Sequence, residues 1–399
     1  MKGGFFSIKI QILVLLSNLC DNCFDMDKLL LYRMYQPRRI IVLLVIITVT
    51  ISIFFLLFFF YYFKQKEKLI NPITSTPIKK QLGLPRVKTF SLDEIFQYRT
   101  PLATEAGSKK DRENEYVLIA TGDVIPARSV NSIMVRLNNF NYPFEKTADF
   151  LKEADLVFIN LETPLFSGCK PTIEGMVFCG DGKAIEGLNY AHVKVANLAN
   201  NHAGDYGLEG INKTMKLLEE SGIAVTGTGE PAILQVKNKK FGFLGYNDVE
   251  KKEGITWADI EKIKKDIESL KPQVNFIVVA FHFGVEYTAK PTERQVELSH
   301  AAIDAGADLI IGNHPHWVQA VEIYKNKFIT YAHGNFVFDQ MWSQETREGV
   351  IGRYVFDETG LVDVSFYPVI IENYSQPRFA KELEAVKILQ RMKEVSNSF

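Results

Sequence analysis

The sequence has 399 residues and a formal net charge of −1, with 46 lysines and arginines against 47 aspartates and glutamates. This balance offers no basic face for nucleic acid and no acidic tail, so nucleic acid is excluded as an expected partner. The length allows two ordinary domains, or one large domain with appendages.

Near the N-terminus, Ile40–Phe63 is an uncharged run of 24 residues, almost all of them aliphatic or aromatic. At about 1.5 Å per helical residue it reaches about 36 Å, which is enough to cross a bilayer core. The run therefore predicts one transmembrane helix, preceded by an N-terminal cytoplasmic arm over residues 1–39. Because MYQPRR directly precedes the run, translation from Met34 is an alternative start.

Charges on the two sides of this predicted helix nearly cancel, because three arginines precede it and three lysines follow it. A short arm ahead of a long globular remainder favours a signal anchor whose N-terminus stays inside. We therefore predict a single-pass protein of the cell membrane with an extracytoplasmic globular domain. Residues 64–115 are expected to form a stalk, since four prolines interrupt the segment and the charged run Lys109–Glu115 ends it.

From Tyr116 onward, short apolar runs alternate with amphipathic stretches, which is typical of a layered α/β fold with a mixed β-sheet. Strands are expected at Tyr116–Ala120, Leu156–Ile159, Val193–Ala199, Ala224–Thr226, Phe241–Tyr246, Phe276–Phe281, Leu309–Ile311 and Phe328–Tyr331. Helices are expected at Leu208–Glu220, Trp257–Leu270 and Glu293–Ala305. The main domain spans residues 116–345, and residues 346–399 complete it with strands at Val350–Phe356 and Leu361–Tyr367 and a helix at Ala380–Val395.

Several element ends carry capping or turn residues. Thr256 and Thr292 are expected to be N-caps of the second and third helices, and Gly222 and Gly306 suit helix C-termini. Two hairpins are predicted, at Val236–Phe241 and Tyr324–Phe328.

Polar side chains follow five of the expected strands, at the sheet edge where ligand sites form in such folds. They are Asp123 and Arg128, Asn160 and Glu162, Asn200–His202 with Asp205, His282 with Glu286, and His314 with His316. One polar strand end is ordinary, and Asp123 alone would suit a turn. Five in succession, with nitrogen and oxygen ligands and no thiol, favour a hard or borderline metal centre.

His314 and His316 flank Pro315, just after the apolar run Ala307–Ile311. Side chains at i and i+2 of an extended turn project in the same general direction, and the proline keeps His314 out of a helical conformation. Two imidazoles on a stiff turn predict a metal or phosphate site.

Six stretches in this part of the chain resemble the CapA family of capsule (poly-γ-glutamate) synthesis proteins. They are TGDVIPAR (Thr121–Arg128), NLETPL (Asn160–Leu165), ANNHAGDYG (Ala199–Gly207), HFGVEY (His282–Tyr287), GADLIIGNHPHWVQ (Gly306–Gln319) and YAHGNFVFDQ (Tyr331–Gln340). The resemblance covers about Tyr116 to Gln340 and implies a calcineurin-like metallophosphoesterase fold.

The resemblance also implies roles for individual residues. The metal ligands would be Asp123, Glu162, Asn201, His282, His314 and His316, with Glu162 in the bridging position. The catalytic residues would be His202 as general acid or transition-state stabiliser, Asp205 as the group that orients it, and Glu286. The substrate contacts would be Arg128, Asn160, Trp317 and Gln319.

Two positions depart from ordinary metallophosphoesterases, which carry a histidine where Ile125 stands and an aspartate where Glu162 stands. CapA relatives share both departures, so the family resemblance holds, but the number of bound divalent ions, one or two, stays open. Mn, Zn, Fe and Mg are the candidate ions.

The resemblance implies metal-dependent hydrolysis, of a phosphoester or of the polymer's amide, during synthesis or export of poly-γ-glutamate. The expected partners are the membrane, an anionic polymer or phosphoester substrate, and other capsule-synthesis membrane subunits. One alternative is a non-catalytic subunit that binds the anionic polymer. Another is a phosphatase unrelated to capsule, because a fold does not fix a substrate.

The four cysteines form two close pairs in the sequence. Cys169 and Cys179 bracket a short loop after Glu162, and a disulfide there is expected if the domain is extracytoplasmic. We draw no prediction of a disulfide or a site from Cys20 and Cys23. Outside the polar clusters, His192 and His300 are expected to be surface or helix-face residues, and no site role is expected for His333.

Overall fold

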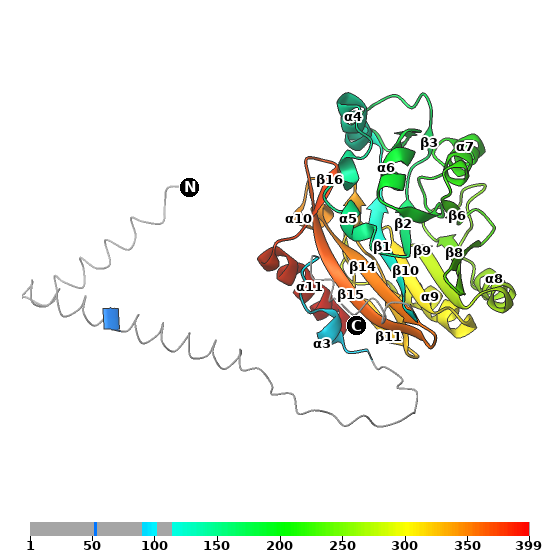
Figure 1. The fold of residues 1–399 in the computed structure, drawn as a ribbon, viewed down its shortest axis with the longest axis vertical. Coiled ribbons are helices and arrows are strands. Elements are labelled where there is room, and N and C mark those ends of the chain that lie inside the picture. The colour runs from blue at the N-terminus through cyan, green and yellow to red at the C-terminus, as the bar shows by residue number, and fades with distance from the viewer. Residues whose placement is uncertain (1–51, 54–89, 102–113, 399) are drawn as a thin grey trace, which may run out of the picture. The chain divides into compact units, whose positions relative to one another are not determined.

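The computed structural model describes residues 52–53, 90–101 and 114–398 (Figure 1). The chain divides into two units, residues 1–85 and 86–399, and only Ser52 and Ile53 of the first unit are described. Apart from Ser52 and Ile53, the predicted transmembrane helix lies outside the described residues, as does most of the predicted stalk. Within the described ranges, no helix is both long enough and apolar enough to cross a membrane.

The first sheet has eight strands, some from the beginning of the α/β region and some from its end. Its path runs β16 (Gln376–Phe379), β15 (Gly360–Glu372), β14 (Glu348–Asp357), β1 (Tyr116–Val124), β2 (Leu156–Leu161), β5 (Val193–Asn197) and β6 (Ala224–Thr226), and β13 (Asn335–Val337) pairs with β1 off this path. The pairs along β1, β2, β5 and β6 are parallel, whereas β14, β15 and β16 are antiparallel additions. The sheet is mixed, as the sequence predicted.

The second sheet has six strands. They are β11 (Val321–Tyr324), β12 (Lys327–Thr330), β10 (Leu309–Asn313), β9 (Phe276–His282), β8 (Lys239–Asn247) and β7 (Ala232–Val236) in that order. The strands β12, β10, β9 and β8 run parallel, and antiparallel hairpins close both edges. Both predicted hairpins are confirmed. A third, two-stranded sheet joins β3 (Leu165–Phe166) to β4 (Gly180–Asp181).

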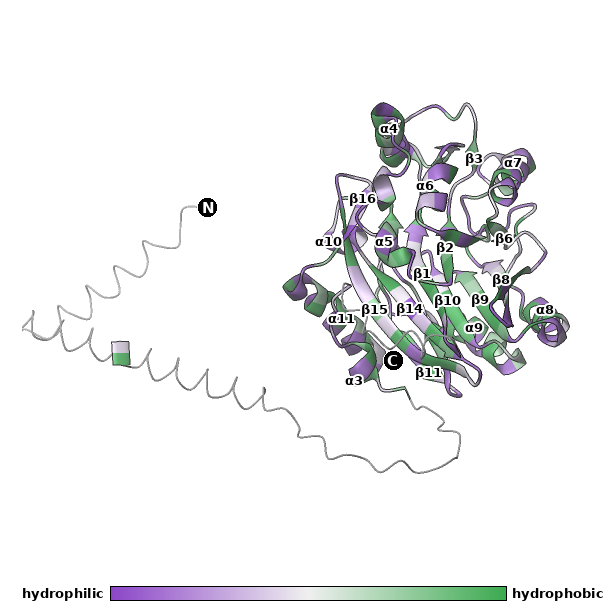
Figure 2. Ribbon diagram, viewed as in Figure 1, coloured by the Kyte–Doolittle hydropathy of each residue, from purple (hydrophilic) through white to green (hydrophobic). Residues whose placement is uncertain are grey.

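The main core lies between the two large sheets. Phe158 of β2 stacks on Phe243 of β8 with ring centroids 5.8 Å apart, and aliphatic residues of both sheets surround them. A fully buried side chain of this size contributes about 2 kcal/mol from loss of apolar surface to water. Figure 2 shows this hydrophobic character on central strands such as β9 and β10. Two sheets that share one core bring their strand ends together.

Helices cover the outer faces of both sheets, which gives a four-layer architecture. The first sheet is covered by α4 (Arg128–Leu137), α5 (Ala148–Leu151), α6 (Ala184–Tyr190) and α7 (Gly207–Glu220), and the second by α8 (Ile260–Leu270) and α9 (Glu293–Ala305). The remaining short helices are α3 (Leu92–Ile95), η2 (Tyr142–Phe144), η3 (Lys271–Gln273) and α10 (Gln344–Arg347). The last helix, α11 (Glu382–Asn397), packs against β15 and β11. The predicted layered α/β fold is confirmed.

The predicted caps at both ends of α9 are confirmed, and the predicted N-cap of α8 is corrected. Thr292 forms a capping box with Gln295 at the start of α9, and Gly306 ends that helix with φ 123°, as predicted. The predicted N-cap at Thr256 is wrong, because α8 begins at Ile260 and Asp259 accepts the hydrogen bond from the Lys262 amide. Thr256 instead accepts from the amide of Asn247 at the end of β8, so its backbone extends the sheet edge.

Candidate metal centre

Ligand-type side chains from four strand ends converge between the two large sheets. Asp123 lies near the end of β1, Glu162 follows β2, His282 is the last residue of β9, and His314 and His316 follow β10. Two groups of three offer ligand atoms that all lie within 4.8 Å of one another, Glu162 with His282 and His314, and Glu162 with Asp123 and His316. Glu162 belongs to both groups, which is the place the family resemblance gave it.

Close backbone packing aligns these strand ends. A Cβ atom at Gly122 would lie 2.2 Å from the carbonyl oxygen of Gly334, so only glycine lets β13 approach β1 beside Asp123. After β10, the turn that carries the histidine pair holds His314 at φ 100° and His316 at φ 55°. Positive φ is uncommon for non-glycine residues and collects at functional sites, where the surrounding structure enforces it.

Buried polar atoms without a partner mark this cluster. Within the described residues, both carboxylate oxygens of Glu162 and Nδ1 of His314 have no hydrogen bond, although these residues are at most 4% exposed, and Oδ2 of Asp123 has only the ion-pair contact with Nδ1 of His316 at 3.2 Å. A buried carboxylate without a partner costs several kcal/mol, so such groups are normally paired or bind a metal. The donor set of carboxylate oxygens and imidazole nitrogens suits a divalent ion. The residues therefore fit a metal centre.

Asn160 holds two of the ligand residues in place. Its Nδ2 lies 2.8 Å from Oδ1 of Asp123 and 3.2 Å from Nδ1 of His282. Its Oδ1 accepts from the side-chain amides of Asn197, at 3.0 Å, and Asn200, at 3.2 Å. Asn160 thus has no polar atom left for a substrate, and we place it among the groups that orient the ligands, not among those that touch a substrate.

Two asparagines complete the surroundings of the histidines. Oδ1 of Asn201 lies 2.7 Å from Nε2 of His282, so the predicted ligand Asn201 does lie at the cluster. Oδ1 of Asn335, on β13, lies 2.9 Å from Nδ1 of His316. Asn335 was not singled out from the sequence, although the YAHGNFVFDQ stretch that contains it was recognised.

Burial and charges within the cluster shift the pKa values of its titrating groups in opposite directions. Burial would raise the pKa of Asp123, but the hydrogen bond and charge of His316 outweigh burial and lower it. Burial, together with the Asp123 charge, raises the pKa of Glu162 to about 8. Burial lowers the pKa of His282 to about 3 and that of His314 well below its usual value. For His316, burial is outweighed by Asp123 and Glu162, which raise its pKa to about 9. Two neutral imidazoles therefore face an Asp123–His316 ion pair whose Oδ2 and Nδ1 are 3.2 Å apart.

His202 and Asp205 form a hydrogen-bonded pair beside the ligand cluster. Nδ1 of His202 lies 2.8 Å from Oδ2 of Asp205, so the predicted orientation of His202 by Asp205 is what the structure shows. Oδ1 of the same carboxylate lies 2.8 Å from Nζ of Lys252, and burial of Asp205 is outweighed by these hydrogen bonds, which lower its pKa. His202 directly follows Asn201, whose Oδ1 lies 2.7 Å from Nε2 of His282, so the pair is close to the ligands.

The other predicted site residues have different surroundings. Glu286 is half-buried and acts through its charge on Glu162 and His282. Trp317 is half-buried, and its Nε1 has no hydrogen bond. Gln319 is fully buried, and its side-chain amide bonds Gln295 and Thr288. We therefore move Gln319 from the expected substrate contacts to the groups that fix the loop.

Arg128 is also held by protein groups. Its guanidinium forms a buried ion pair with Asp339 and donates to the carbonyl oxygen of Gly175 at 3.2 Å. The guanidinium carbon lies 4.9 Å from the ring centroid of Phe178 and 5.0 Å from that of Phe338. Arg128 begins α4 with φ 47°, so its position is enforced by these contacts. Its expected contact with a substrate gives way, in this structure, to a contact with the loop that carries Phe178.

The remaining histidines and cysteines bear on the sequence expectations. His333 is buried, with Nε2 2.9 Å from the hydroxyl of Tyr354, and His300 lies on α9, as expected for a helix-face residue, and pairs with Glu322. Cys169 and Cys179 are joined by a disulfide. The disulfide closes the loop whose carbonyl at Gly175 accepts from Arg128.

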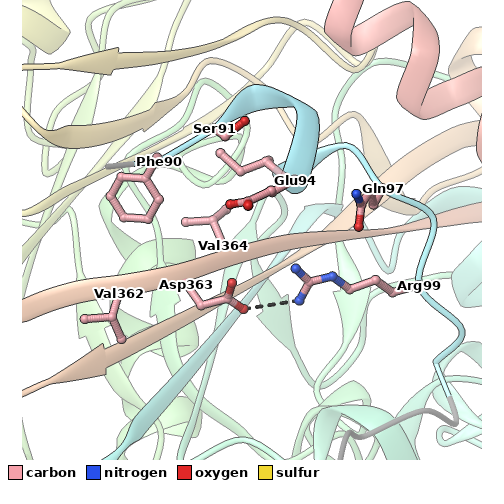
Figure 3. A pocket seen from close by; sticks show the side chains of 9 residues that line it. Phe90, Ser91, Glu94, Gln97, Arg99, Val362, Asp363 and Val364 are labelled. Atoms are coloured by element: carbon pink, nitrogen blue, oxygen red, sulfur yellow. Dashed lines mark hydrogen bonds and ion pairs between the residues drawn. The ribbon is translucent and has the colours of Figure 1, made fainter. Parts of the chain in front are cut away.

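A separate cavity of about 290 Å³ lies between α3 and β15 (Figure 3). Among its lining residues, Arg99 and Asp363 form an ion pair at 3.3 Å. Asp363 pairs in register with Val355 of β14, which pairs with Val117 at the start of β1. The cavity therefore lies at the opposite end of β1 from Asp123, about 20 Å away along the strand.

Comparisons with known proteins found a matching family, similar proteins and similar solved structures. The family described as bacterial capsule synthesis protein PGA_cap matches residues 117–340. The chain is 29% identical over 307 residues to the capsule biosynthesis protein CapA of Bacillus anthracis, covering 71% of this chain and 74% of that protein. It is 28% identical over 295 residues to the PGA biosynthesis protein CapA of Bacillus subtilis, covering 69% and 77%. A phosphatase structure from Mycoplasma pneumoniae is similar at 14% identity with a TM-score of 0.44, covering 66% of this chain and 95% of that chain.

Proposed function

The chain belongs to the bacterial capsule synthesis protein PGA_cap family, and from that premise we propose that it is a metal-dependent hydrolase acting in capsule or poly-γ-glutamate synthesis or export. The family match spans the six stretches recognised in the sequence. Its two CapA relatives are named for capsule and PGA biosynthesis. The chemistry is the part of the proposal that rests on the site itself.

One observation carries the hydrolase proposal, namely that Glu162 presents two buried, unpartnered oxygens to two sets of ligands. Asp123 and His316 form one group with it, and His282 and His314 form the other. A divalent ion held by these residues supplies Lewis-acid polarisation of an ester or amide oxygen. Mn, Zn, Fe and Mg remain the candidates, and the number of ions is one or two.

Residues of this chain would then hold and transfer the proton that the reaction needs. His202 keeps its Nδ1 on Asp205, which leaves Nε2 as the ring nitrogen that exchanges a proton with a leaving group. Lys252 fixes the other oxygen of Asp205 and so holds the carboxylate in one orientation. The fork of Asn160 amide hydrogens keeps Asp123 and His282 aligned.

A second proposal is a non-catalytic subunit that binds polymer carboxylates in the same place. The feature that favours it is Ile125, which is buried among Ala127, Phe178 and Phe338 where ordinary metallophosphoesterases carry a histidine. The missing imidazole weakens the ligand set on the Asp123 side. This proposal predicts polyanion binding without turnover and at most one bound ion.

We further propose that the protein is a single-pass protein of the cell membrane with the described domain outside. The uncharged run Ile40–Phe63 supports the anchor. The Cys169–Cys179 disulfide supports the outside location, since disulfides persist in oxidising compartments. Protease protection in intact cells tests this, and digestion of the domain only after lysis would contradict it.

The hydrolase proposal is tested on the full-length protein in detergent. Metal content is measured by mass spectrometry, and turnover is measured with phosphodiesters, phosphomonoesters and poly-γ-glutamate. The variants His282→Ala and His314→Ala are expected to lose both metal and turnover. Unchanged turnover in both variants would refute catalysis at this site, and polymer binding without turnover in the wild type would favour the binding subunit.

A further inference from the structure

We propose that the disulfide-closed loop Cys169–Cys179 is a positioning element for His202, and that Phe178 is the residue through which it acts. The inference rests on the proposed hydrolase function for its catalytic consequence, but its structural part stands on contacts alone. It assigns a role to residues that neither the sequence motifs nor the ligand set include.

Phe178 touches both members of the His202–Asp205 pair. Its ring stacks on the imidazole of His202 with centroids 4.2 Å apart and an angle of 28° between the planes. Its backbone amide donates to Oδ2 of Asp205 at 2.8 Å, the same oxygen that lies 2.8 Å from Nδ1 of His202. One residue therefore fixes the plane of the imidazole and the carboxylate that orients it.

Phe178 is the one buried side chain among residues 170–178 of the loop. Residues 170–177 are all exposed, whereas Phe178 is 1% exposed. Ile173, at 69% exposed, and Met176, at 61%, show how little of the loop is packed. A segment with so few buried contacts does not hold a buried ring in place by its own packing.

Three restraints replace that packing. The disulfide joins Cys179, the residue directly after Phe178, to Cys169 at the start of the loop. Arg128 lies over the Phe178 ring and donates to the Gly175 carbonyl, while Asp339 holds the guanidinium. The hydroxyl of Ser132, on α4, donates to the Thr172 carbonyl at 2.8 Å. The disulfide thus restrains the two ends of the loop, and hydrogen bonds from α4 restrain the residues between them.

A chemical consequence follows from this arrangement. The imidazole has Asp205 at Nδ1 and a ring against one face, so its Nε2 points in one direction. When the loop is released, His202 keeps its hydrogen bond but loses the stacked ring that sets its plane. A general acid that is misaligned in this way loses its effect chiefly on substrates whose leaving group needs a proton.

The test compares four forms of the full-length protein, which are the wild type, Phe178→Leu, the double variant Cys169→Ser/Cys179→Ser, and Ile173→Ala as a matched control in the same loop. The first readout is the ¹⁵N-histidine spectrum, in which the His202 resonance is assigned by its loss in His202→Gln. We expect the His202 resonance to shift or broaden in Phe178→Leu and in the double variant, and to stay unchanged in Ile173→Ala.

The second readout is turnover of two phosphoesters that differ only in leaving group. With an alkyl leaving group, kcat is expected to fall at least about tenfold in Phe178→Leu and in the double variant, whereas with 4-nitrophenolate it falls less than about threefold. Metal content is expected to equal that of the wild type in every form. Equal losses on both substrates would overturn the assignment to proton transfer.

Different results would refute the hydrolase proposal and the positioning role of the loop. If the wild type turns over no substrate, the hydrolase proposal fails, and the His202 resonance still decides whether the loop positions the imidazole. An unchanged His202 resonance in Phe178→Leu overturns the positioning role. If the double variant does not fold, Phe178→Leu, which keeps an apolar side chain at that position, decides alone.

Discussion

The acidic residues at the two ends of β1 differ in their burial and in whether their oxygens have partners. At the carboxyl end, beside Asp123, Glu162 is fully buried and both of its oxygens lack a hydrogen bond within the described residues. At the amino end, the 290 Å³ cavity is lined by Arg99 and Asp363, which pair with each other and are both about one-third exposed, at 34%. The first arrangement costs free energy unless a cation is bound, and the second costs nothing.

This contrast shows that a cavity by itself does not locate the site. The cavity between α3 and β15 has solvated ion pairs, whereas side chains of the strand-end cluster lie close together. His282 and His314 have ring centroids 4.8 Å apart, and Nε2 of His282 lies 3.5 Å from Oε1 of Glu162. Unsatisfied buried polar atoms are the feature that distinguishes a site prepared for a ligand.

The largest expected effect is on metal binding in Glu162→Gln. This variant removes the one carboxylate common to both ligand groups, so metal affinity should fall by more than the roughly 10–100-fold of an outer-shell substitution. Stability of the metal-free protein should change by less than about 1 kcal/mol, because an uncharged amide replaces a carboxyl whose pKa of about 8 keeps it neutral at pH 7. Calorimetric titration and denaturant unfolding measure the two quantities. Wild-type metal affinity in this variant would remove Glu162 from the centre.

The next effect is the pH dependence of metal affinity. In the metal-free protein the pKa of Glu162 is raised to about 8 and that of His316 to about 9, so below these values both groups carry protons that an ion must displace. Each displaced proton strengthens binding about tenfold per pH unit, so two displaced protons should raise affinity by more than about 1,000-fold between pH 6 and pH 8. Proton release on metal addition, measured in buffers of different ionisation enthalpy, checks the sign. Affinity that is flat over this range would contradict the ligand assignment.

A smaller effect is expected from Asn160→Ala. The substitution keeps every ligand but removes the amide that bonds Asp123 and His282. Metal affinity should fall by about 10–100-fold, which is the usual cost of losing an outer-shell hydrogen bond. Isothermal titration gives the number, and the substrate KM serves as the control. A raised KM with unchanged metal affinity would return Asn160 to the substrate contacts.

Much of the fold was predictable because its cues are local. Strand positions followed from apolar runs, the two hairpins from their turns, and the Thr292 cap from a threonine directly before an amphipathic stretch. Five strand ends with polar residues also predicted that the ligands converge, since parallel strands present their carboxyl ends at one edge.

The rest of the site depended on pairs far apart in the chain. Arg128 meets Asp339 across 211 positions, and Phe178 reaches Asp205 through a loop that contains no recognisable motif. No spacing in the sequence encodes such contacts. Thr256 was mistaken for an N-cap because Asp259 has equal capping ability, and tertiary pairing of Thr256 with Asn247 decided between them.

The smallest effect should come from Asp363→Asn, which makes the amino end of β1 the control for the carboxyl end. The substitution breaks ion pairs of 3.3 Å with Arg99 and 3.8 Å with Arg353. Because Asp363 and Arg99 are about one-third exposed and Arg353 is 24% exposed, water screens the charges and the loss should be under about 1 kcal/mol. Metal content should not change, since Asp363 lies about 20 Å along the sheet from Asp123. Thermal unfolding and metal analysis of the same sample measure both quantities. A loss of metal in Asp363→Asn as large as that in Glu162→Gln would mean that the two ends of β1 are not independent, and the distinction between paired and unpaired charges would no longer identify the site.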